Sequence, residues 1–486
     1  MNEQLKNCIL RASEAENRGN REEAYDAIAE GFALDPRNVE LFYMMGIYHA
    51  ERHPAQALLC LEQAAFLSGR GYGTPEEDLP VIRAAREQLM LHTGVSPRPL
   101  DIIIVSYNDK EYMAECLDAI RGEVPLTTAL DGPAGSVRVI VVDNASTDGV
   151  LEELRAQQDI VLIENAANEG FSRGCNIGFA QARPSADIFL LNNDAILTPN
   201  ALFWLRMGLC EGPEVGAAGA VSNNATTQMA PFVGSGILMV QNESPDQRHP
   251  FQRYLGRAQA GNIPMRHPYE DRARLTGFAV LLRREAVDAV LSEGQLMDER
   301  YSPAYFEDDD LGMRLAQAGY RQLLCYNSFI YHYGGKGFGG HQDLMSRSRR
   351  IFMDKWGFDI WDYELPMDKP LLMIGDDPRT PIRVLEVGCG MGITLSAIRH
   401  RYPYAWTAGI ELRSQVAAMG RHLADEILVG DIHTMTLPYA PHSFDYIIVT
   451  EVLVQELEGL GPGARSEVLD ARLREYLRPD GMILYN

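Results

Sequence analysis

The chain has 486 residues, 46% of them hydrophobic and 23% charged, with a formal net charge of −23. This length exceeds one ordinary domain, and we expect three. The acidic balance excludes non-specific nucleic-acid binding and a polybasic membrane anchor, because both need clustered Lys and Arg. Seven cysteines without paired spacing favour a reducing compartment, and no apolar stretch approaches the roughly 18 residues of a membrane span. With no apolar signal core at its start, the protein is expected to be cytoplasmic.

Residues 1–96 have the pattern of an all-helical unit with an internal repeat. Small and apolar residues recur at a shift of 33 positions: Ala24, Ile28 and Gly31 return as Ala57, Leu61 and Ala64. The pattern resembles the tetratricopeptide repeat, whose period is about 34 residues. Thr74-Pro-Glu-Glu77 predicts an N-cap and capping box for a closing helix that ends near Gly94. The unit is either a packing module or a groove for a protein partner.

Residues 97–365 alternate between strand and helix patterns. Continuous apolar runs predict parallel strands that are covered on both faces, at 101–105, 138–142, 160–163 and 188–191. Helices are expected between them, at 112–121 and 175–181. This alternation predicts a doubly wound α/β sheet that binds its ligand at the carboxyl ends of the strands. A linker rich in Pro and Asp follows at 366–380, and a new strand at 383–387 opens a third domain over 381–486.

Polar residues follow the predicted strands of this central domain. They include Ser106, Tyr107, Asp143, Asn144, Asn192, Asn193 and Asp194, with a turn at Asn168 and Gly170 before a helix. A strand-end acid can accept from a base or a ribose hydroxyl, an aromatic ring can stack on the base, and a helix N-terminus suits anions. The carboxylate cluster 307–310 and the distant His332 add the parts needed to hold a metal on a diphosphate and to deprotonate a hydroxyl. The alternatives are a solvated acidic helix start and a buried structural histidine.

Residues 98 to about 360 resemble family 2 glycosyltransferases with the GT-A fold, particularly the rhamnosyltransferase-like branch. The motifs that carry the resemblance are Ile-Val-Ser-Tyr-Asn, Val-Asp-Asn-Ala-Ser-Thr-Asp, Asn-Glu-Gly-Phe, Leu-Leu-Asn-Asn-Asp, Thr-Gly-Phe, Phe-Glu-Asp-Asp-Asp-Leu and Tyr-His-Tyr-Gly-Gly. The resemblance implies an inverting transfer from a nucleotide-diphosphate sugar to a hydroxyl of a glycan or protein.

The resemblance also implies a role for each matching residue. Asp308 would be the general base, Asp194 and His332 would bind Mg²⁺ or Mn²⁺, and Thr276, Gly277 and Glu307 would line the acceptor side. The nucleotide sugar would contact Val105, Ser106, Tyr107, Asp143, Asn144, Asn168, Gly170, Asn192 and Asn193. The sequence departs from a strict Asp-x-Asp motif at the neutral Asn192, which should weaken metal binding. The glycine-rich stretch 334–340, with Lys336, has the composition of a mobile lid.

The third domain resembles class I S-adenosylmethionine-dependent methyltransferases. The residues that carry this resemblance follow its strands: Glu386, Gly388, Gly390 and Gly392, then Glu411, then Asp431 and Ile432. They would bind S-adenosylmethionine, with the acids on ribose hydroxyls and the cationic end. Residues 381–486 match only the first five strands, where the family usually continues with two more, so we expect an incomplete domain or a truncated chain. His433 and Glu451 are candidate bases by position only.

The leading hypothesis is an inverting glycosyltransferase in polysaccharide biosynthesis, with an N-terminal helical module and a C-terminal methyltransferase-like domain. One alternative is a methyltransferase that acts on a glycan which the sugar domain recognises. Another is an adaptor whose helical repeats are functional and whose enzyme folds are vestigial.

Overall fold

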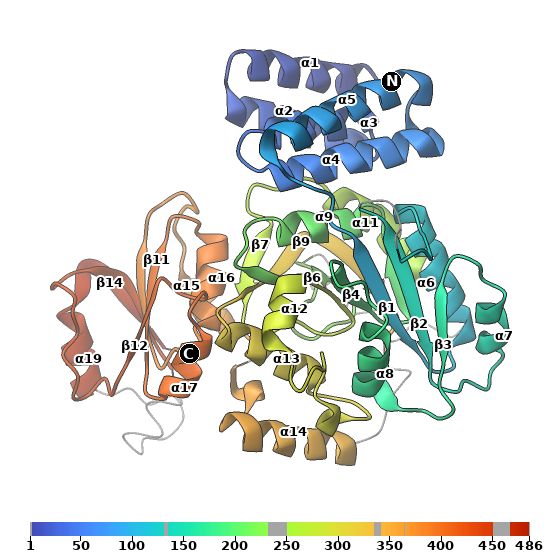
Figure 1. Ribbon diagram of the computed structural model, residues 1–486. Helices are drawn as coiled ribbons and strands as arrows, with labels where there is room; N and C mark the ends of the chain where they lie inside the picture. Colours follow the sequence, from blue (N-terminus) through green and yellow to red (C-terminus); the bar gives the residue numbers. More distant parts are fainter. Residues whose placement is uncertain are drawn as a thin grey trace.

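The structure, a computed structural model, describes residues 2–130, 135–231, 250–334, 342–363, 365–450 and 467–485. Figure 1 shows a helical unit seated on a central α/β domain, with a second, smaller sheet domain beside it. The expected succession of an all-helical region and two α/β domains is confirmed. Among the described helices, none combines the length and apolar character that a membrane crossing requires.

The N-terminal unit consists, in the described residues, of five α-helices: α1 (Glu3–Asn17), α2 (Arg21–Leu34), α3 (Val39–His49), α4 (Pro54–Leu67) and α5 (Pro75–Thr93). Helices α2 and α4 begin and end 33 residues apart, which is the shift seen in the sequence. Two glycines allow close helix packing, because a Cβ on Gly31 would lie 2.8 Å from Leu41 and one on Gly46 would lie 3.0 Å from Leu61. The repeat in the sequence is therefore a repeat of helices.

The start of α5 differs from the expected capping box. Thr74 is the N-cap, but its side chain makes no capping hydrogen bond. Instead, the backbone N–H of Thr74 donates to Oδ2 of Asp78 at 2.7 Å, so the carboxylate one residue after Glu77 satisfies the exposed backbone group. The helix ends at Gly94, which has φ 71°, as the sequence predicts.

The helical unit packs on α9 (Ala201–Leu209) of the central domain. Phe203 and Trp204 of α9 enter the core of the helical unit, where Phe203 meets the ring of Phe42 at 5.0 Å. The guanidinium of Arg37 forms an ion pair with the buried carboxylate of Glu123. Apolar burial and a buried ion pair together fix this junction.

The central domain is built on a mixed sheet of nine described strands in the order β3-β2-β1-β4-β8-β6-β9-β5, with β7 also paired to β9. The strands are β1 (Leu100–Ser106), β2 (Val137–Asp143), β3 (Val161–Glu164), β4 (Asp187–Leu191), β5 (Ala195–Leu197), β6 (Val215–Val221), β7 (Tyr269–Arg272), β8 (Ala279–Leu282) and β9 (Arg321–His332). Strands β3, β2, β1 and β4 are parallel, as expected, whereas β8 runs antiparallel to β4 and β6. The predicted α/β sheet is therefore mixed: it is parallel from β3 to β4 and again between β6 and β9, with β8 antiparallel between the two parts.

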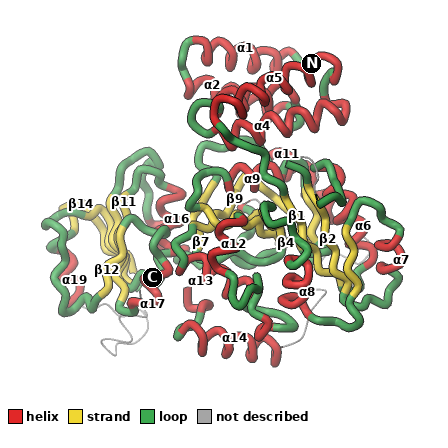
Figure 2. Tube along the Cα trace, viewed as in Figure 1, coloured by secondary structure: helices red, strands yellow, loops and turns green. Residues whose placement is uncertain are grey.

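Helices cover this sheet, as Figure 2 shows. They are α6 (Lys110–Glu123), α7 (Val150–Arg155), α8 (Gly170–Phe179), α11 (Pro250–Gly261), α12 (Arg284–Val290) and α13 (Glu307–Gln317), besides α9. Helix α14 (Gln342–Trp356) lies apart from the sheet, and its Phe352 packs with Tyr301 and Phe306. The core lies between the sheet and these helices and includes Ile102, Val139 and Phe189, all fully buried. Strands buried on both faces carry the continuous apolar runs that made them recognisable.

The C-terminal domain has a parallel sheet in the order β12-β11-β10-β13-β14. Its strands are β10 (Arg383–Val387), β11 (Trp406–Glu411), β12 (Glu426–Val429), β13 (Phe444–Val449) and β14 (Leu477–Tyr485), with helices α16 (Ile393–Arg401), α17 (Ser414–Met419) and α19 (Glu467–Arg474). The predicted linker contains a short helix, α15 (Asp368–Met373).

Candidate active sites

The carboxyl ends of β1 and β2 place the first group of predicted residues side by side. Ser106 is fully buried, and its Oγ has no hydrogen-bond partner among the described residues. Val105 is half-buried, and Tyr107 is 45% exposed and free to stack on a flat ligand. At the end of β2, Asp143 accepts from the hydroxyl of Ser146 at 2.6 Å and from its N–H at 3.0 Å. These hydrogen bonds hold the Asp143 carboxylate in one orientation.

Asn144 joins this region to the predicted turn. Its Nδ2 donates to the carbonyl of Gly170 at 3.1 Å, and its Oδ1 accepts from Asn165 at 2.8 Å. Asn168 accepts from the N–H of Gly170 at 2.9 Å, and Gly170 has φ 81°. A Cβ at Gly170 would lie 2.6 Å from Cα of Pro303, so only glycine fits here. The side-chain amide of Asn144 thus holds the turn in place through hydrogen bonds within the protein.

Asp194 and His332 form a pair at the junction of β4, β5 and β9. Oδ1 of Asp194 lies 3.3 Å from Nε2 of His332, and the N–H of Gly334 donates to Oδ2 at 2.9 Å. Burial raises the pKa of Asp194, but the hydrogen bonds from His332 and Gly334 outweigh it, so the pKa is lowered overall. Burial likewise opposes charging of His332, yet the bond and the charge of Asp194 raise its pKa. The shift at Asp194 favours its negative form, and the shift at His332 favours its protonated form.

Two asparagines, which the sequence reasoning missed, fix the ring of His332. Nδ1 of His332 lies 2.8 Å from the carbonyl oxygen of Asn224. Because a carbonyl can only accept, Nδ1 carries the hydrogen and Nε2 faces Asp194. Asn223 bonds both backbone groups of His332, at 2.9 and 3.0 Å. The single signal that the sequence offered was their position directly after β6.

Phe278 connects this pair to the acid cluster. Its ring stacks on His332 with centroids 4.9 Å apart, and its carbonyl accepts from the N–H of Asn192 at 2.8 Å. Asn192 Nδ2 lies 3.4 Å from Nε2 of His332, while the buried Nδ2 of Asn193 has no partner among the described residues. The predicted Asn192-Asn193-Asp194 segment therefore borders the histidine directly.

Asp308 differs from its acidic neighbours at the start of α13. Its Oδ2 accepts from the N–H of Gly277 at 2.8 Å, and its Oδ1 from the N–H of Asp309 at 2.9 Å. In contrast, Asp309 is paired with Arg274, and Asp310 lies 2.9 Å from Nε of Arg314 and 2.6 Å from Nζ of Lys355. Two members of the cluster are thus structural, and Asp308 keeps a half-buried carboxylate that, among the described residues, backbone donors hold.

Glu307 is buried beside Asp308. Its Oε2 has no partner among the described residues, and burial, followed by the charge of Asp308, raises its pKa well above the ordinary value. The raised pKa favours the protonated carboxyl group, which can donate a hydrogen bond. On the same side, Thr276 lies 3.3 Å from Thr227, hydroxyl to hydroxyl, and its N–H donates to the buried side chain of Gln228.

The structure therefore brings Asp194, His332 and Asp308 together through Gly277 and Phe278. No group of three His, Cys, Asp or Glu residues gathers as a metal site in the described part of the chain. A carboxylate and an imidazole nitrogen facing one another at 3.3 Å nevertheless fit a divalent metal, if diphosphate oxygens and water complete its ligands. The predicted lid, 334–340 with Lys336, lies outside the described residues except for Gly334.

The predicted cofactor loop of the C-terminal domain leads from β10 into α16. Gly388, Gly390 and Gly392 all have positive φ, at 78°, 55° and 85°. Oε2 of Glu411, at the end of β11, accepts from the N–H of Gly390 at 3.0 Å. The ring of Tyr363, in the 3-10 turn Ile360–Tyr363, packs on the loop, since a Cβ on Gly390 would lie 2.5 Å from it. The loop is thus shaped by glycines and held by an acid.

Two further acids lie at the same sheet edge. Glu386 is 2% exposed, its Oε2 has no partner among the described residues, and burial raises its pKa well above the ordinary value. Asp431 accepts from the N–H of His433 at 2.8 Å, and Ile432 is buried. A cationic, donor-bearing ligand would satisfy the free oxygen of Glu386 and would offset the cost of placing its charge beside Glu411. The other candidate base, Glu451, lies outside the described residues.

Comparisons with known proteins agree with this division of the chain. Residues 101–270 match the family model "Glycosyl transferase family 2", and residues 385–485 match "Methyltransferase domain". N-acetylglucosaminyl-diphospho-decaprenol L-rhamnosyltransferase from two strains of Mycobacterium tuberculosis is 24% identical over 270 residues, covering 52% of this chain and 83% of that protein.

Two solved structures are similar in part. One is mannosyltransferase PcManGT from Pyrobaculum calidifontis in complex with GDP-Man and Mn²⁺, with 17% identity, a TM-score of 0.36, and coverage of 71% of this chain and 81% of that one. The other is GalNAc-T7 with UDP, GalNAc and Mn²⁺, with 12% identity, a TM-score of 0.38, and coverage of 55% and 49%. From the two family matches, we conclude that the chain carries a family 2 glycosyltransferase domain followed by a methyltransferase domain.

Proposed function

We propose that the central domain transfers a sugar, with inversion, from a nucleotide-diphosphate sugar to a hydroxyl of a glycan or protein, and that Asp308 is the general base. The observation that carries this proposal is the state of Asp308 within its cluster. Its neighbours Asp309 and Asp310 are neutralised by cations, whereas in the described part of the chain the carboxylate of Asp308 is held by backbone N–H groups. A carboxylate that is fixed but not ion-paired can accept a proton from an attacking hydroxyl.

Glu307 has a complementary role in this proposal. Because burial raises its pKa, the protonated form of its carboxyl group is favoured and can donate a hydrogen bond, while Asp308 accepts one. The two adjacent acids would then hold the acceptor between a donor and an acceptor. Thr276 and Gly277 lie on the same side, through the bond from Gly277 to Asp308.

Asp194 and His332 would hold a divalent metal, Mg²⁺ or Mn²⁺. When bound, such a metal neutralises the charge that develops on the diphosphate leaving group. The residues of this chain orient the site, since Asn224 fixes the imidazole tautomer and Gly334 fixes the carboxylate. The buried Oγ of Ser106 and Nδ2 of Asn193, both without partners among the described residues, would be satisfied by the nucleotide sugar. Val105, Tyr107, Asp143 and the Asn168–Gly170 turn would complete its pocket.

The name of the Mycobacterium relative supports an acceptor that is itself a saccharide carrying diphosphate, and hence a role in polysaccharide biosynthesis. The decisive experiment replaces one oxygen of the base. Asp308→Asn should keep donor binding, measured by calorimetry with the nucleotide diphosphate, and lose transfer by a factor on the order of 10² to 10⁴. Asp118→Asn, at an exposed acid, is the matched control. Full transfer by Asp308→Asn would refute the base assignment.

A second activity is favoured by the acids around the glycine loop. We propose that Glu386, Glu411 and Asp431, with Gly388, Gly390, Gly392 and Ile432, bind S-adenosylmethionine. The observation behind it is the buried, unsatisfied Oε2 of Glu386 beside Glu411. Calorimetric titration of the whole chain with S-adenosylmethionine tests it, and an absence of heat would remove it. The helical unit remains a proposed surface for a protein partner.

A further inference from the structure

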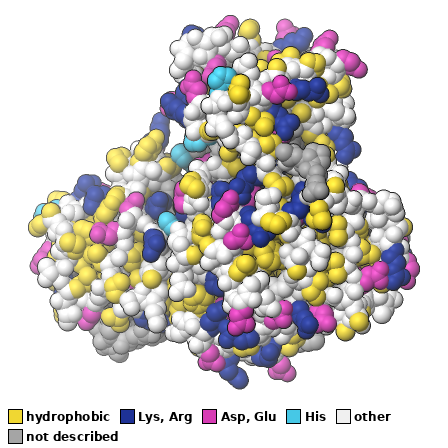
Figure 3. All heavy atoms as spheres, viewed as in Figure 1, with side chains coloured by type: hydrophobic (Ala, Val, Ile, Leu, Met, Phe, Trp, Pro, Cys, Tyr) yellow, Lys and Arg dark blue, Asp and Glu magenta, His cyan; other side chains and the backbone are white. Residues whose placement is uncertain are grey.

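Helix α14 lies outside the sheet and presents one face to the acidic start of α13. Ser348 and Phe352 of this helix are buried, whereas charged side chains gather over its outer face, as Figure 3 shows. Together with Lys355 and Trp356 they stand at positions i, i+4, i+7 and i+8, which share one face of a helix. The sequence of α14 therefore sets four side chains in a row along the segment 298–310.

The backbone that leads into α13 is strained. Tyr305 and Phe306 have φ angles of 77° and 70°, in a region that residues with a bulky side chain rarely occupy. Such a conformation persists where the surrounding structure holds it. The hydroxyl of Ser348 donates to the carbonyl of Ala304 at 3.0 Å, and the ring of Phe352 lies 5.7 Å from that of Phe306 between centroids. Helix α14 thus supports the strained entry directly.

Asp310 ties the first turn of α13 to the end of α14. Its carboxylate is fully buried, and its Oδ1 accepts from Nε1 of Trp356 at 2.9 Å and lies 2.6 Å from Nζ of Lys355. The same ammonium group lies 3.0 Å from Asp298. The other oxygen of Asp310 accepts from Nε of Arg314 at 2.9 Å. A carboxylate with charged donors on both oxygens has a fixed position.

The proposed base stands in this same turn, two residues before Asp310. The N–H of Asp310 donates to the carbonyl of Phe306 at 2.9 Å and closes the turn around Asp308. The backbone of one hydrogen-bonded helical turn moves as a unit. A displacement of Asp310 would therefore move Asp308 relative to Gly277, which donates to its carboxylate from another element.

The C-terminal domain supports α13 from its other end. Phe352 belongs to an apolar core that also contains Met313 of α13 and Met419 of α17. Nε2 of His422 lies 2.8 Å from the carbonyl oxygen of Gly319, just beyond the end of α13. The helix that carries the acid cluster is thus held at its start by α14 and at its end by the methyltransferase domain.

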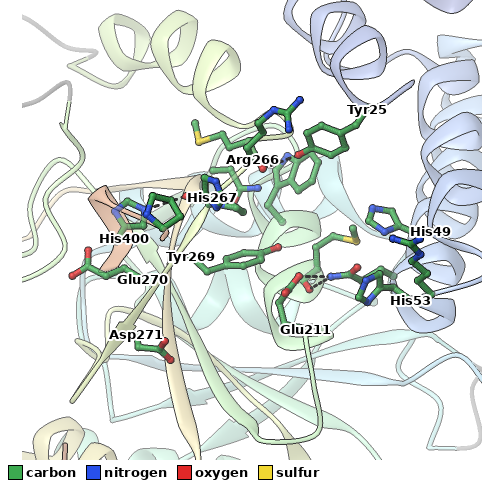
Figure 4. Close-up of a pocket in the computed structure, with 18 of the residues that line it drawn as sticks. Tyr25, His49, His53, Glu211, Arg266, His267, Tyr269, Glu270, Asp271 and His400 are labelled. Carbon is green, nitrogen blue, oxygen red and sulfur yellow. Dashed lines mark hydrogen bonds between the residues drawn. The ribbon is translucent and has the colours of Figure 1, made fainter. Parts of the chain in front are cut away.

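This domain is in turn fixed to the central domain at the segment 265–271. Figure 4 shows His400 of the C-terminal domain beside His267, and its Nε2 lies 3.1 Å from the carbonyl oxygen of His267. The hydroxyl of Ser396 donates to the carbonyl of the last residue of the segment at 2.6 Å. The hydroxyl of Tyr25, from the helical unit, donates to the carbonyl of the first at 2.7 Å. The supports of α13 therefore have a defined place relative to the sheet.

We propose that Trp356 and Lys355 are positioning residues for sugar transfer, which hold Asp308 in place through Asp310. This inference rests on the proposed role of Asp308 as the general base. Loss of either side chain should slow the chemical step and leave binding of the nucleotide sugar unchanged, because the acid cluster lies on the acceptor side of the proposed site.

Trp356→Phe tests the indole N–H and keeps an aromatic ring in the core. Turnover is followed as release of the nucleotide diphosphate from the most active donor in a panel of UDP-, dTDP- and GDP-sugars, with Mn²⁺ and with water as the acceptor. We expect kcat to fall about tenfold, with KM for the donor within about twofold of that of the unmodified chain.

Trp204→Phe is the matched control, because Nε1 of Trp204 donates to the carbonyl of Asn262 at 2.8 Å in a buried site away from α13. It removes a comparable buried hydrogen bond, so the temperature of thermal unfolding should fall while kcat and KM stay unaltered. A contribution of Trp356 to stability alone would give the same result as this control.

Lys355 offers a second test that does not depend on the folding of Trp356→Phe. Lys355→Met removes the cation between Asp298 and Asp310, whereas Lys355→Arg keeps one. The fall in kcat should therefore occur in Lys355→Met and be largely restored in Lys355→Arg, with the donor KM unchanged in both. Thermal unfolding shows that each variant is folded.

Unchanged kcat in both Trp356→Phe and Lys355→Met would overturn the proposal and leave α14 with a structural role alone. A rise in the donor KM at constant kcat would also overturn it, because it would place these side chains on the donor side. Asp308→Asn separates the two proposals: if it loses turnover while the α14 variants keep theirs, the base assignment stands and the positioning role is wrong.

Discussion

The backbone N–H of Gly277 donates to Oδ2 of Asp308 at 2.8 Å, and this one bond joins the end of the Thr-Gly-Phe segment to the acidic helix. A Cβ added at Gly277 would lie 3.3 Å from Cβ of Asp308, tighter than ordinary van der Waals contact. The position of the proposed base thus depends on a glycine on a different element, 31 residues earlier in the chain.

Gly277→Ala should therefore displace Asp308 by a few tenths of an ångström. We expect kcat to fall about tenfold, with KM for the nucleotide sugar almost unchanged, because positioning of the base and not donor binding is disturbed. Steady-state kinetics measures both. Gly256→Ala, in a helix where an added Cβ meets no atom within 4 Å, is the control and should leave kinetics unaltered. Equal kinetics in the two variants would contradict this role.

Removal of metal should abolish transfer, since Asp194 and His332 are proposed to hold it on the diphosphate. Chelation by EDTA should stop turnover and added Mn²⁺ should restore it. His332→Gln should raise the Mn²⁺ concentration for half-maximal activity by about 10- to 100-fold. His92→Gln, at an exposed histidine of α5, should not change it. Full activity in EDTA would show that the transfer needs no metal.

Glu411→Gln should weaken S-adenosylmethionine binding. The carboxylate holds the N–H of Gly390 and lies beside the buried Glu386, so an amide loses both charge and one acceptor. We expect an increase in Kd of at least tenfold by calorimetry. Glu426→Gln is the matched control, because Glu426 begins β12 and bonds Tyr439 instead of the loop. Equal affinities in both variants would argue against the acid pair as the cofactor site.

Glu123 should make the stability of the protein depend on pH. Burial raises its pKa from 4.5 to about 7, although Arg37 opposes this rise. The folded protein then binds more protons than the unfolded chain between these values, so its free energy of unfolding falls as pH rises from about 4.5 to about 7, by about 3 kcal/mol. Urea unfolding at about pH 5 and pH 8 measures it.

Glu123→Gln isolates this contribution, because other titrating groups are common to both proteins. The difference in unfolding free energy between pH 5 and pH 8 should be smaller in Glu123→Gln than in the unmodified chain. The same pH dependence in both proteins would mean that Glu123 is charged at low pH in the folded state.

The sequence predicted those parts of the fold and site that depend on local pattern. Buried parallel strands leave continuous apolar runs, and parallel strands end at one edge, so Asp143 and Asp194 could be expected near one another. The glycine-rich turn after β10 could likewise be recognised from neighbouring residues alone. The shift of 33 positions matched α2 and α4 because packing of repeated helices repeats their small residues.

The remaining features depend on contacts between distant segments. Asn223 and Asn224 hold His332 across more than a hundred residues, and their position after β6 is the one local feature that marks them. Strand β8 lies antiparallel beside β4. Its direction depends on the arrangement of the whole sheet, and the apolar run of β8 itself does not indicate it. The backbone N–H of Thr74 donates to Asp78 and not to Glu77. The sequence spacing alone does not tell which of these two neighbouring carboxylates accepts the bond.

The seven residues at 265–271 have a mechanical consequence. Tyr25 bonds their first carbonyl, while His400 and Ser396 bond the third and the last. The helical unit and the methyltransferase domain are hydrogen-bonded to this same segment. A rotation of either unit therefore strains the bonds that hold the other. Small motions of the helical unit and of the methyltransferase domain should accordingly be correlated and not independent.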